Sequence, residues 1–145
     1  MDFKQKCVLI YLAPEESQSI LDWITANVKN TMFLLYEQIL PDDTFGKVML
    51  RNLKSRNIEL KGIHAYPTLE AQIQRFKQLN WNGAFAVDIN TLHDRPSAQS
   101  EIKRISQLQL LDELEEWRLL AAHYCVAWAW KCNIDNAGLA NIRLS

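Results

Sequence analysis

Residues 31–53, TMFLLYEQILPDDTFGKVMLRNL, constrain the fold more than any other stretch of this sequence. Residues 32–36 form a short apolar run that is typical of a buried strand. The run ends in the polar pair Glu37 and Gln38, and the following Pro-Asp-Asp favours a turn. A helix is predicted to open at Thr44, so the stretch reads as half of a βαβ unit.

Ligands of such sheets bind beyond the carboxyl ends of the strands. Glu37 and Gln38 stand at that place in the predicted unit, and we therefore expect them to meet a ligand. The alternative is a polar pair that only ends a core strand.

The composition indicates one soluble domain, with 145 residues of which 48% are hydrophobic and 23% charged. The net charge of -1 gives no electrostatic case for a nucleic-acid or membrane-surface partner. No apolar run approaches the roughly 18 residues that span a bilayer, and the N-terminus does not resemble a signal peptide. The three cysteines show no metal-ligand spacing, which indicates reduced thiols and a cytoplasmic or nuclear location.

The other predicted elements give an α/β class. Residues 7–12, CVLIYL, form an apolar run expected of a strand that is covered on both faces. A helix is predicted from Pro14, and the strand at residues 32–36 should pair parallel to the first strand. Further elements are a helix from Thr68 to about residue 79, a strand at 84–89, helices from about 97 and around 111–117, and a strand at 122–131.

Isolated polar residues prove little. His64, His93 and His123 lack zinc-site spacing, so no metal ligand is assigned. His123 and Cys125, two residues apart on a predicted strand, would share one face, which is more often core than a catalytic pair. The acidic cluster around residues 112–116 is either a site for a basic ligand or a solvated helix face. The sequence contains no GxSxG, P-loop or GxGxxG motif, and no catalytic residue is assigned.

Several motifs in collinear order point to a family. They are CVLIYLAPEES, MFLLYEQ, DTFGKVML, TLEAQIQRF, AVDIN and DELEEW followed by HYCVAWA. With these motifs the chain resembles the leucine carboxyl methyltransferase family, from Cys7 to about Ile142. The resemblance implies a Rossmann-like fold that uses S-adenosyl-L-methionine. It also implies, as partner and substrate, the catalytic subunit of type 2A protein phosphatases, methylated at its C-terminal leucine carboxylate.

A sister branch of the family, the tRNA wybutosine-synthesising methyltransferases, acts on a carboxyl group of a modified guanosine and adds a kelch-repeat propeller. EEW before HY is similar to that branch, whereas the end of the chain, NAGLANIRL, is similar to the phosphatase-directed branch. The phosphatase-directed branch is our first expectation and the tRNA branch the alternative.

The resemblance makes residues 1–145 the C-terminal part of such a domain, because family members are more than twice as long. We therefore expect a sheet that is incomplete at its N-terminal side, without the glycine-rich cofactor loop. A truncated gene model, an alternative start and a decayed paralogue are the explanations, in that order. The family has an acidic cofactor-lining residue at the position of Lys6, so we expect cofactor binding there to be lost and the chain alone to be inactive.

The implied reaction is direct transfer of a methyl group to a carboxylate, which is already ionised at neutral pH and needs no general base. Alignment of the two groups and exclusion of water then carry catalysis. Tyr11, Glu37 and Gln38 are predicted to line the cleft, and residues 43–68 to help form the acceptor side. A non-catalytic module that binds phosphatase subunits is the other hypothesis. We also expect an exposed apolar strand edge at residues 7–12, which would favour aggregation.

Overall fold

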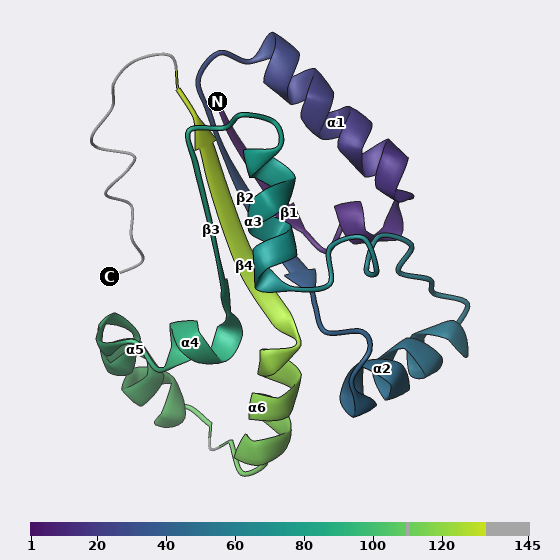
Figure 1. Ribbon diagram of the computed structural model, residues 1–145. Coiled ribbons are helices and arrows are strands. Elements are labelled where there is room, and N and C mark those ends of the chain that lie inside the picture. The colour runs from purple at the N-terminus through teal and green to yellow at the C-terminus, as the bar shows by residue number, and fades with distance from the viewer. Residues whose placement is uncertain (110, 133–145) are drawn as a thin grey trace.

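The computed structural model describes residues 1–109 and 111–132, which form one mixed sheet with helices around it (Figure 1). The sheet has the order β1-β2-β4-β3. Its strands are β1 (Asp2–Lys6), β2 (Thr31–Gln38), β3 (Gly83–Asp88) and β4 (Tyr124–Lys131). β1 is parallel to β2, and β4 is antiparallel to both β2 and β3. β1, β2 and β3 therefore run in one direction. Their carboxyl ends lie together at one end of the sheet, which is called the carboxyl edge below. The α/β class is confirmed, and the sheet is consistent with part of a Rossmann-like fold.

The helices occupy two positions relative to the sheet (Figure 1). Two of them, α1 (Pro14–Asn27) and α3 (Leu69–Lys77), pack on the same face. The others lie beyond the carboxyl edge: α2 (Thr44–Lys54), α4 (Ile89–His93), α5 (Pro96–Ser106) and α6 (Leu114–Ala122). This edge is therefore the part of the sheet at which most connecting segments converge.

Phe33 of β2 forms the centre of the core between the sheet and the two helices that cover it. Its ring is fully buried and lies 5.6 Å from Phe76 of α3 and 6.4 Å from Trp81, centroid to centroid. The indole Nε1 of Trp81 donates a hydrogen bond of 2.9 Å to Oγ1 of Thr25 on α1, so the polar atom of this buried ring is satisfied. Burial of one such aromatic side chain stabilises the fold by about 1.5–3 kcal/mol.

Side-chain caps fix the helix starts that the sequence predicts. Asp43 accepts a hydrogen bond of 2.7 Å from the Gly46 N–H at the start of α2, and Thr68 accepts one of 3.1 Å from Ala71 at the start of α3. α1 begins with Pro14 at its first position, as predicted. The predictions of helix starts at Pro14, Thr44 and Thr68 are confirmed, the last within one residue.

The predicted strand at residues 7–12 is wrong. Cys7 has a φ of 50°, which turns the chain out of the sheet directly after β1, and Leu9–Tyr11 form one turn of 3-10 helix. The run is apolar because it packs in two directions: Leu9 enters the main core, and Ile10 joins a second cluster with Leu60 and Ile63. An apolar run that is buried on both sides does not need to be a strand, and here it is a turn.

The edge strand is instead the polar segment Asp2–Lys6, in which Phe3 and Gln5 are half-buried and the other side chains are exposed. The expected apolar strand edge at residues 7–12 is therefore absent from the described sheet. β1 is held by its parallel ladder with β2, in register from Asp2 with Met32 to Lys6 with Tyr36. Backbone hydrogen bonds place this strand, so its side chains do not need to be apolar.

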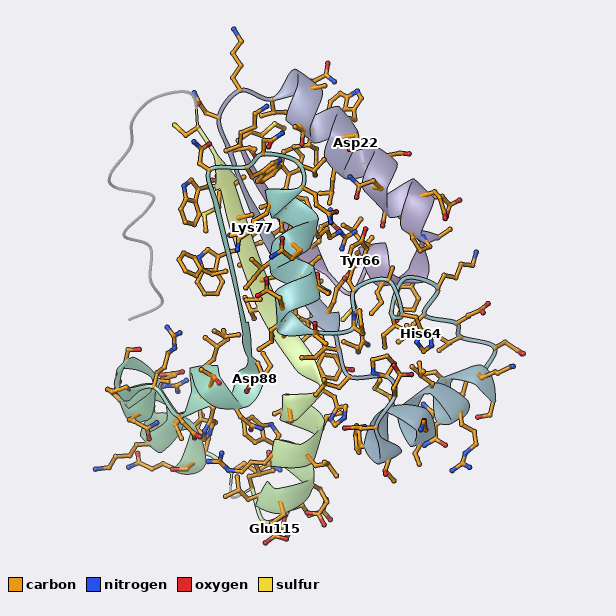
Figure 2. All side chains as sticks on the ribbon, viewed as in Figure 1. Asp22, His64, Tyr66, Lys77, Asp88 and Glu115 are labelled. Carbon is orange, nitrogen blue, oxygen red and sulfur yellow. The ribbon has the colours of Figure 1, made fainter. Side chains whose placement is uncertain are left out.

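Two further boundaries differ from prediction. β2 extends to Gln38, so the polar pair at its end belongs to the strand. β4 starts at Tyr124, because Ala122 ends α6 and His123 follows as its C-cap. The acidic side chains at 112–116 are exposed, and Figure 2 shows Glu115 at the outer end of α6, as expected of a solvated helix face. Among the described residues, no helix is long and apolar enough to cross a membrane.

Candidate functional site

A pocket of about 340 Å³ lies at the carboxyl edge of the sheet, where α/β folds bind ligands. The ends of three strands and α6 supply most of its wall, and α4 supplies one residue. The lining residues are Lys6, Cys7, Tyr36, Ile89, Trp117, Leu120, Ala121 and Tyr124. Sequence segments that are more than 100 residues apart therefore meet at one place.

Two tyrosines form the floor of this carboxyl-edge pocket on the sheet. The rings of Tyr36 and Tyr124 stack with centroids 5.2 Å apart and an interplanar angle of 23°. The side-chain amide of Gln38 donates a hydrogen bond of 3.2 Å to the hydroxyl oxygen of Tyr124. Burial raises the pKa of both phenols, so both hydroxyls keep their hydrogens at neutral pH. The floor thus offers apolar rings with neutral hydroxyl groups.

Lys6 and Cys7 form the rim of the pocket at the end of β1. The Cys7 N–H donates a hydrogen bond of 2.7 Å to the Tyr36 carbonyl, which completes the ladder just before the chain turns away. Burial, and then Glu37, raise the pKa of the Cys7 thiol, while the ammonium of Lys6 lowers it. Lys6 is the only Lys, Arg, Asp or Glu among the lining residues, so the ionised charge of the pocket wall is positive.

Glu37 points to the opposite face of the sheet from Tyr36, because successive strand residues alternate. Its carboxylate Oε2 lies 3.7 Å from Nη1 of Arg75 on α3, and both side chains are at most 2% exposed. Burial raises the pKa of Glu37, with Arg75 as the strongest opposing influence, and burial likewise lowers the pKa of Arg75. Desolvation of the two charges therefore outweighs their mutual attraction.

Arg75 also stacks over the ring of Tyr66, with Cζ 4.1 Å from the ring centroid. Within the described part of the chain its guanidinium nitrogens donate no hydrogen bond. The buried pair ties the end of β2 to α3 and to the segment before it, and so fixes the backbone that carries Gln38.

None of the other predicted cleft residues is among those that line the pocket. Tyr11 is 41% exposed. Gln38 is 5% exposed and contacts the pocket through the Tyr124 hydroxyl. That Tyr11, Glu37 and Gln38 line a ligand cleft stays a prediction, and in this structure Glu37 and Gln38 are enclosed by protein.

The prediction that His123 and Cys125 share one face of a strand is wrong, because β4 begins only at Tyr124. His123 follows α6, where its Nδ1 contacts the Leu119 carbonyl oxygen at 2.8 Å and its Nε2 contacts Oδ2 of Asp43 at 2.9 Å. Cys125 lies inside β4, and burial raises the pKa of its thiol to about 12. Such a thiol is protonated at neutral pH and is a poor nucleophile.

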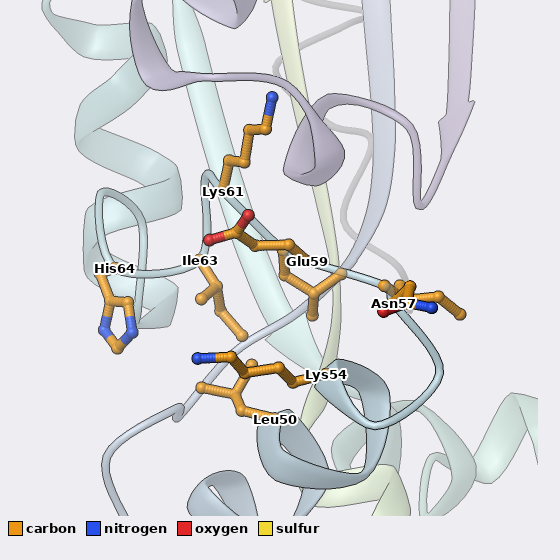
Figure 3. A pocket seen from close by; sticks show the side chains of 9 residues that line it. Leu50, Lys54, Asn57, Glu59, Lys61, Ile63 and His64 are labelled. Atoms are coloured by element: carbon orange, nitrogen blue, oxygen red, sulfur yellow. The ribbon is translucent and has the colours of Figure 1, made fainter.

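A second cavity of about 630 Å³ lies between α2 and residues 57–64, within the segment that the resemblance assigns to the acceptor side (Figure 3). Leu50 and Ile63 contribute apolar surface, and Lys54, Glu59 and Lys61 contribute charges of both signs. The mixed signs favour no particular ligand. In the described ranges, no three His, Cys, Asp or Glu side chains gather as a metal site would require.

Sequence reasoning identified Lys6 but missed the two tyrosines and Trp117. The sequence could have identified Tyr36 as a pocket residue, since it precedes the polar pair at the end of a predicted strand. Tyr124 and Trp117 carried none, because their position depends on the antiparallel insertion of β4 between β2 and β3.

Comparison with known proteins shows that this chain is similar to proteins that are named as methyltransferases. The chain is 41% identical over 134 residues to "Leucine carboxyl methyltransferase 1" of Emericella nidulans, covering 87% of this chain and 35% of that protein. It is 44% identical over 124 residues to "Leucine carboxyl methyltransferase 1 homolog" of Arabidopsis thaliana, covering 86% of this chain and 37% of the relative.

The tRNA branch is also represented. The chain is 36% identical over 129 residues to "tRNA wybutosine-synthesizing protein 4" of Rattus norvegicus, covering 89% of this chain and 19% of that protein. No family model matches the chain. The similarity to leucine carboxyl methyltransferases that the motifs predict is confirmed over most of this chain, which spans about a third of the length of the relatives of that name.

Proposed function

We propose that this chain is the C-terminal, acceptor-side part of an S-adenosyl-L-methionine-dependent carboxyl methyltransferase domain. Its substrate would be the C-terminal leucine carboxylate of the type 2A protein phosphatase catalytic subunit, and its place of action the cytoplasm. The observation that carries the proposal is the 41% identity over 134 residues to a leucine carboxyl methyltransferase. The pocket at the carboxyl edge of the sheet supports it, because that edge is the ligand-binding side of this kind of fold.

The described residues do not by themselves fit the cofactor. S-adenosyl-L-methionine carries a sulfonium cation, whereas the pocket wall presents the ammonium of Lys6 and no carboxylate. Two cations in one small cavity repel each other. We therefore derive no step through the cofactor, and we expect the 145-residue chain alone to bind it poorly and to transfer no methyl group.

The contribution of this chain to the reaction is positioning. A carboxylate acceptor has a pKa of about 3.3–3.7 when it is a chain terminus, so it attacks as the anion without a general base. The stacked tyrosines and Trp117 would exclude water from the acceptor, and the buried pair of Glu37 and Arg75 would hold the end of β2 in place.

A chimera tests the proposed function. The matching segment of the Emericella nidulans relative is replaced by this chain, with Lys6 kept or changed to Glu, and methyl-ester formation is followed by mass spectrometry. The substrate is the phosphatase catalytic subunit with or without its C-terminal leucine. We expect the Lys6→Glu chimera to form the ester only when the leucine is present, and the Lys6 chimera to form much less. Failure of both folded chimeras would refute the proposal.

The two alternatives give different outcomes. A non-catalytic phosphatase-binding module predicts that the chain binds the catalytic subunit while neither chimera forms an ester. The tRNA branch, which the 36% identity to a wybutosine-synthesizing protein favours, predicts ester formation on tRNA and none on the phosphatase.

A further inference from the structure

Exposed charges beyond the carboxyl edge of the sheet are separated by sign. α2 and the two residues after it carry no carboxylate, and their exposed basic side chains form a basic surface: Lys47, Arg51, Lys54 and Arg56. The start of α6 and the residues just before it carry no basic side chain, and their exposed carboxylates form an acidic surface: Asp112, Glu113, Glu115 and Glu116. Within the described part of the chain, none of these side chains forms an ion pair.

The basic and the acidic surface do not meet within one copy of the chain. The contact of His123 with Asp43 joins the end of α6 to the start of α2. The acidic surface lies at the opposite end of α6, where Figure 2 shows Glu115, and the basic surface extends along α2 to Arg56 beyond its far end. From their junction the two helices diverge (Figure 1). Each surface is therefore available to a partner of the opposite charge.

Apolar side chains accompany both charged surfaces. On α2, the exposed Val48 lines a hollow of about 220 Å³ together with the half-buried Phe45, Met49 and Leu53. Next to the acidic surface in the sequence, the exposed aliphatic side chains are Leu108, Leu111, Leu114 and Leu119. Exposed apolar groups that gather beside charge of one sign are typical of a surface that binds another protein.

We propose that a second copy of this chain occupies both surfaces, in a pair with twofold symmetry. The axis passes between α2 and α6, so that the basic surface of each copy faces the acidic surface of the other. The leucines beside the acidic surface then meet the hollow on α2, and the two contacts are identical by symmetry. Charge complementarity identifies the occupant, because the chain presents cations on one helix and anions on another, so each copy supplies what the other lacks. The inference does not depend on the proposed function.

Sedimentation equilibrium of the intact 145-residue chain tests the pair. We expect the mean mass to rise with concentration from that of one chain to that of two, and to stop there. Because salt screens contacts between exposed charges, raising the NaCl concentration from about 50 mM to about 500 mM should weaken the association by at least about tenfold. Growth beyond two chains would overturn the twofold arrangement.

Two charge reversals assign the contact to the two surfaces. Glu115→Lys with Glu116→Lys makes the acidic surface more basic, and Arg51→Glu with Lys54→Glu makes the basic surface more acidic. Each reversal alone should weaken the association by at least about tenfold, because like charges then face each other. A thermal melt verifies that each variant is folded.

The matched control places the same change in net charge on α1. Glu15→Lys with Asp22→Lys alters two exposed carboxylates of that helix, which packs on a face of the sheet and belongs to neither surface. This control should change the association by less than about twofold.

Mixing the two reversed proteins separates a specific contact from a general attraction of net charge. In the mixture both contacts of a pair join opposite charges, so the two variants should pair about as tightly as the native chain does. Mixing the α1 control with Arg51→Glu and Lys54→Glu brings together the same net charges but leaves one contact repulsive. That mixture should pair at least about tenfold more weakly.

Three results would overturn the inference: a chain that stays monomeric at about 1 mM, equal losses in the α1 control and the α6 reversal, or equal affinity in the two mixtures. A monomeric chain whose acidic surface binds a basic amphipathic peptide would assign that surface to a different protein. None of these outcomes depends on methyl transfer.

Discussion

The Nε2 atom of His123 lies 2.9 Å from Oδ2 of Asp43 and joins the end of α6 to the start of α2 across 80 residues of sequence. The same carboxylate caps α2 by accepting from the Gly46 N–H at 2.7 Å. His123 is 1% exposed and packs on the ring of Phe45, 4.3 Å between centroids. One side chain thus fixes both the helix start and the junction that leads into β4.

Asp43→Asn should lower the urea midpoint of unfolding at pH 7, and Asp43→Ala should lower it further, because Asn still caps a helix. The Gly46 N–H and then His123 lower the pKa of Asp43 from 3.8. A depressed carboxyl pKa stabilises the folded state above the unfolded pKa, and this contribution is lost as the pH falls through the folded pKa. The difference in urea midpoint between the native chain and Asp43→Asn should therefore disappear in acid.

Asp42→Asn, at a neighbouring exposed carboxylate, is the control for Asp43→Asn. A difference in midpoint of the same size at pH 7 and pH 3 would contradict the assignment.

Arg75→Met should destabilise the fold by about 3–5 kcal/mol at pH 7, because it leaves the carboxylate of Glu37 buried without a counter-charge. Without Arg75, the pKa of Glu37 rises further above 4.5. A raised carboxyl pKa means that stability is lost as the pH rises through the folded pKa, so the defect should grow from acid to neutral pH. Urea unfolding at several pH values measures this. Lys77→Met, at an exposed position of α3, should cost less than about 0.5 kcal/mol.

Adding Glu37→Gln to Arg75→Met should restore part of the lost stability, because no unpaired charge then stays buried. A double variant that is as unstable as the sum of the two single variants would mean that the buried charges do not interact.

Gly83→Ala should destabilise the chain by about 1–3 kcal/mol through overpacking. A Cβ at this position would lie 2.1 Å from Cζ2 of Trp130, and no positive φ is involved. Gly62→Ala is the matched control, since its nearest neighbour would lie at an ordinary 3.4 Å, and it should change stability by less than about 1 kcal/mol. Thermal unfolding compares the two. If the steric explanation is correct, Trp130→Leu rescues Gly83→Ala, and additive losses would rule it out.

Tyr124→Phe should cost about 1–3 kcal/mol, because the amide of Gln38 loses its acceptor in a site where Gln38 is 5% exposed. Tyr11→Phe removes the same atom from a side chain that is 41% exposed, and should cost less than about 0.5 kcal/mol. Chemical denaturation distinguishes them, and similar losses in both variants would show that the contact with Gln38 does not matter.

The sequence predicts those structural features that depend on a few neighbouring residues. Asp43 and Thr68 cap their helices because a short polar side chain can accept a hydrogen bond from an N–H three residues further along the chain. The α/β class followed from alternating apolar strands and amphipathic helices. These features depend on separations of a few residues.

The sequence does not predict features that depend on residues far apart along the chain. Residues 7–12 were expected to be a strand because burial on both sides is typical of parallel sheets, but Leu9 and Ile10 achieve that burial in two separate clusters. The contact of Asp43 with His123, and the meeting of Tyr36 with Trp117 in the pocket, depend on where β4 inserts into the sheet. No local pattern encodes that insertion.

The edge strand β1 is polar, whereas an apolar edge was expected, and this difference changes how copies of this sheet could associate. An added strand at that edge would have to desolvate the exposed lysines at positions 4 and 6, which protects the edge as charged residues commonly do. The other edge of the described sheet is β3, where Phe85 is 38% exposed. Association through the β3 edge joins two copies of the described sheet around a twofold axis and then stops, because its other edge, β1, is protected by lysines. Edge-to-edge pairing of the described sheet would therefore end at a closed pair and would not grow into a filament.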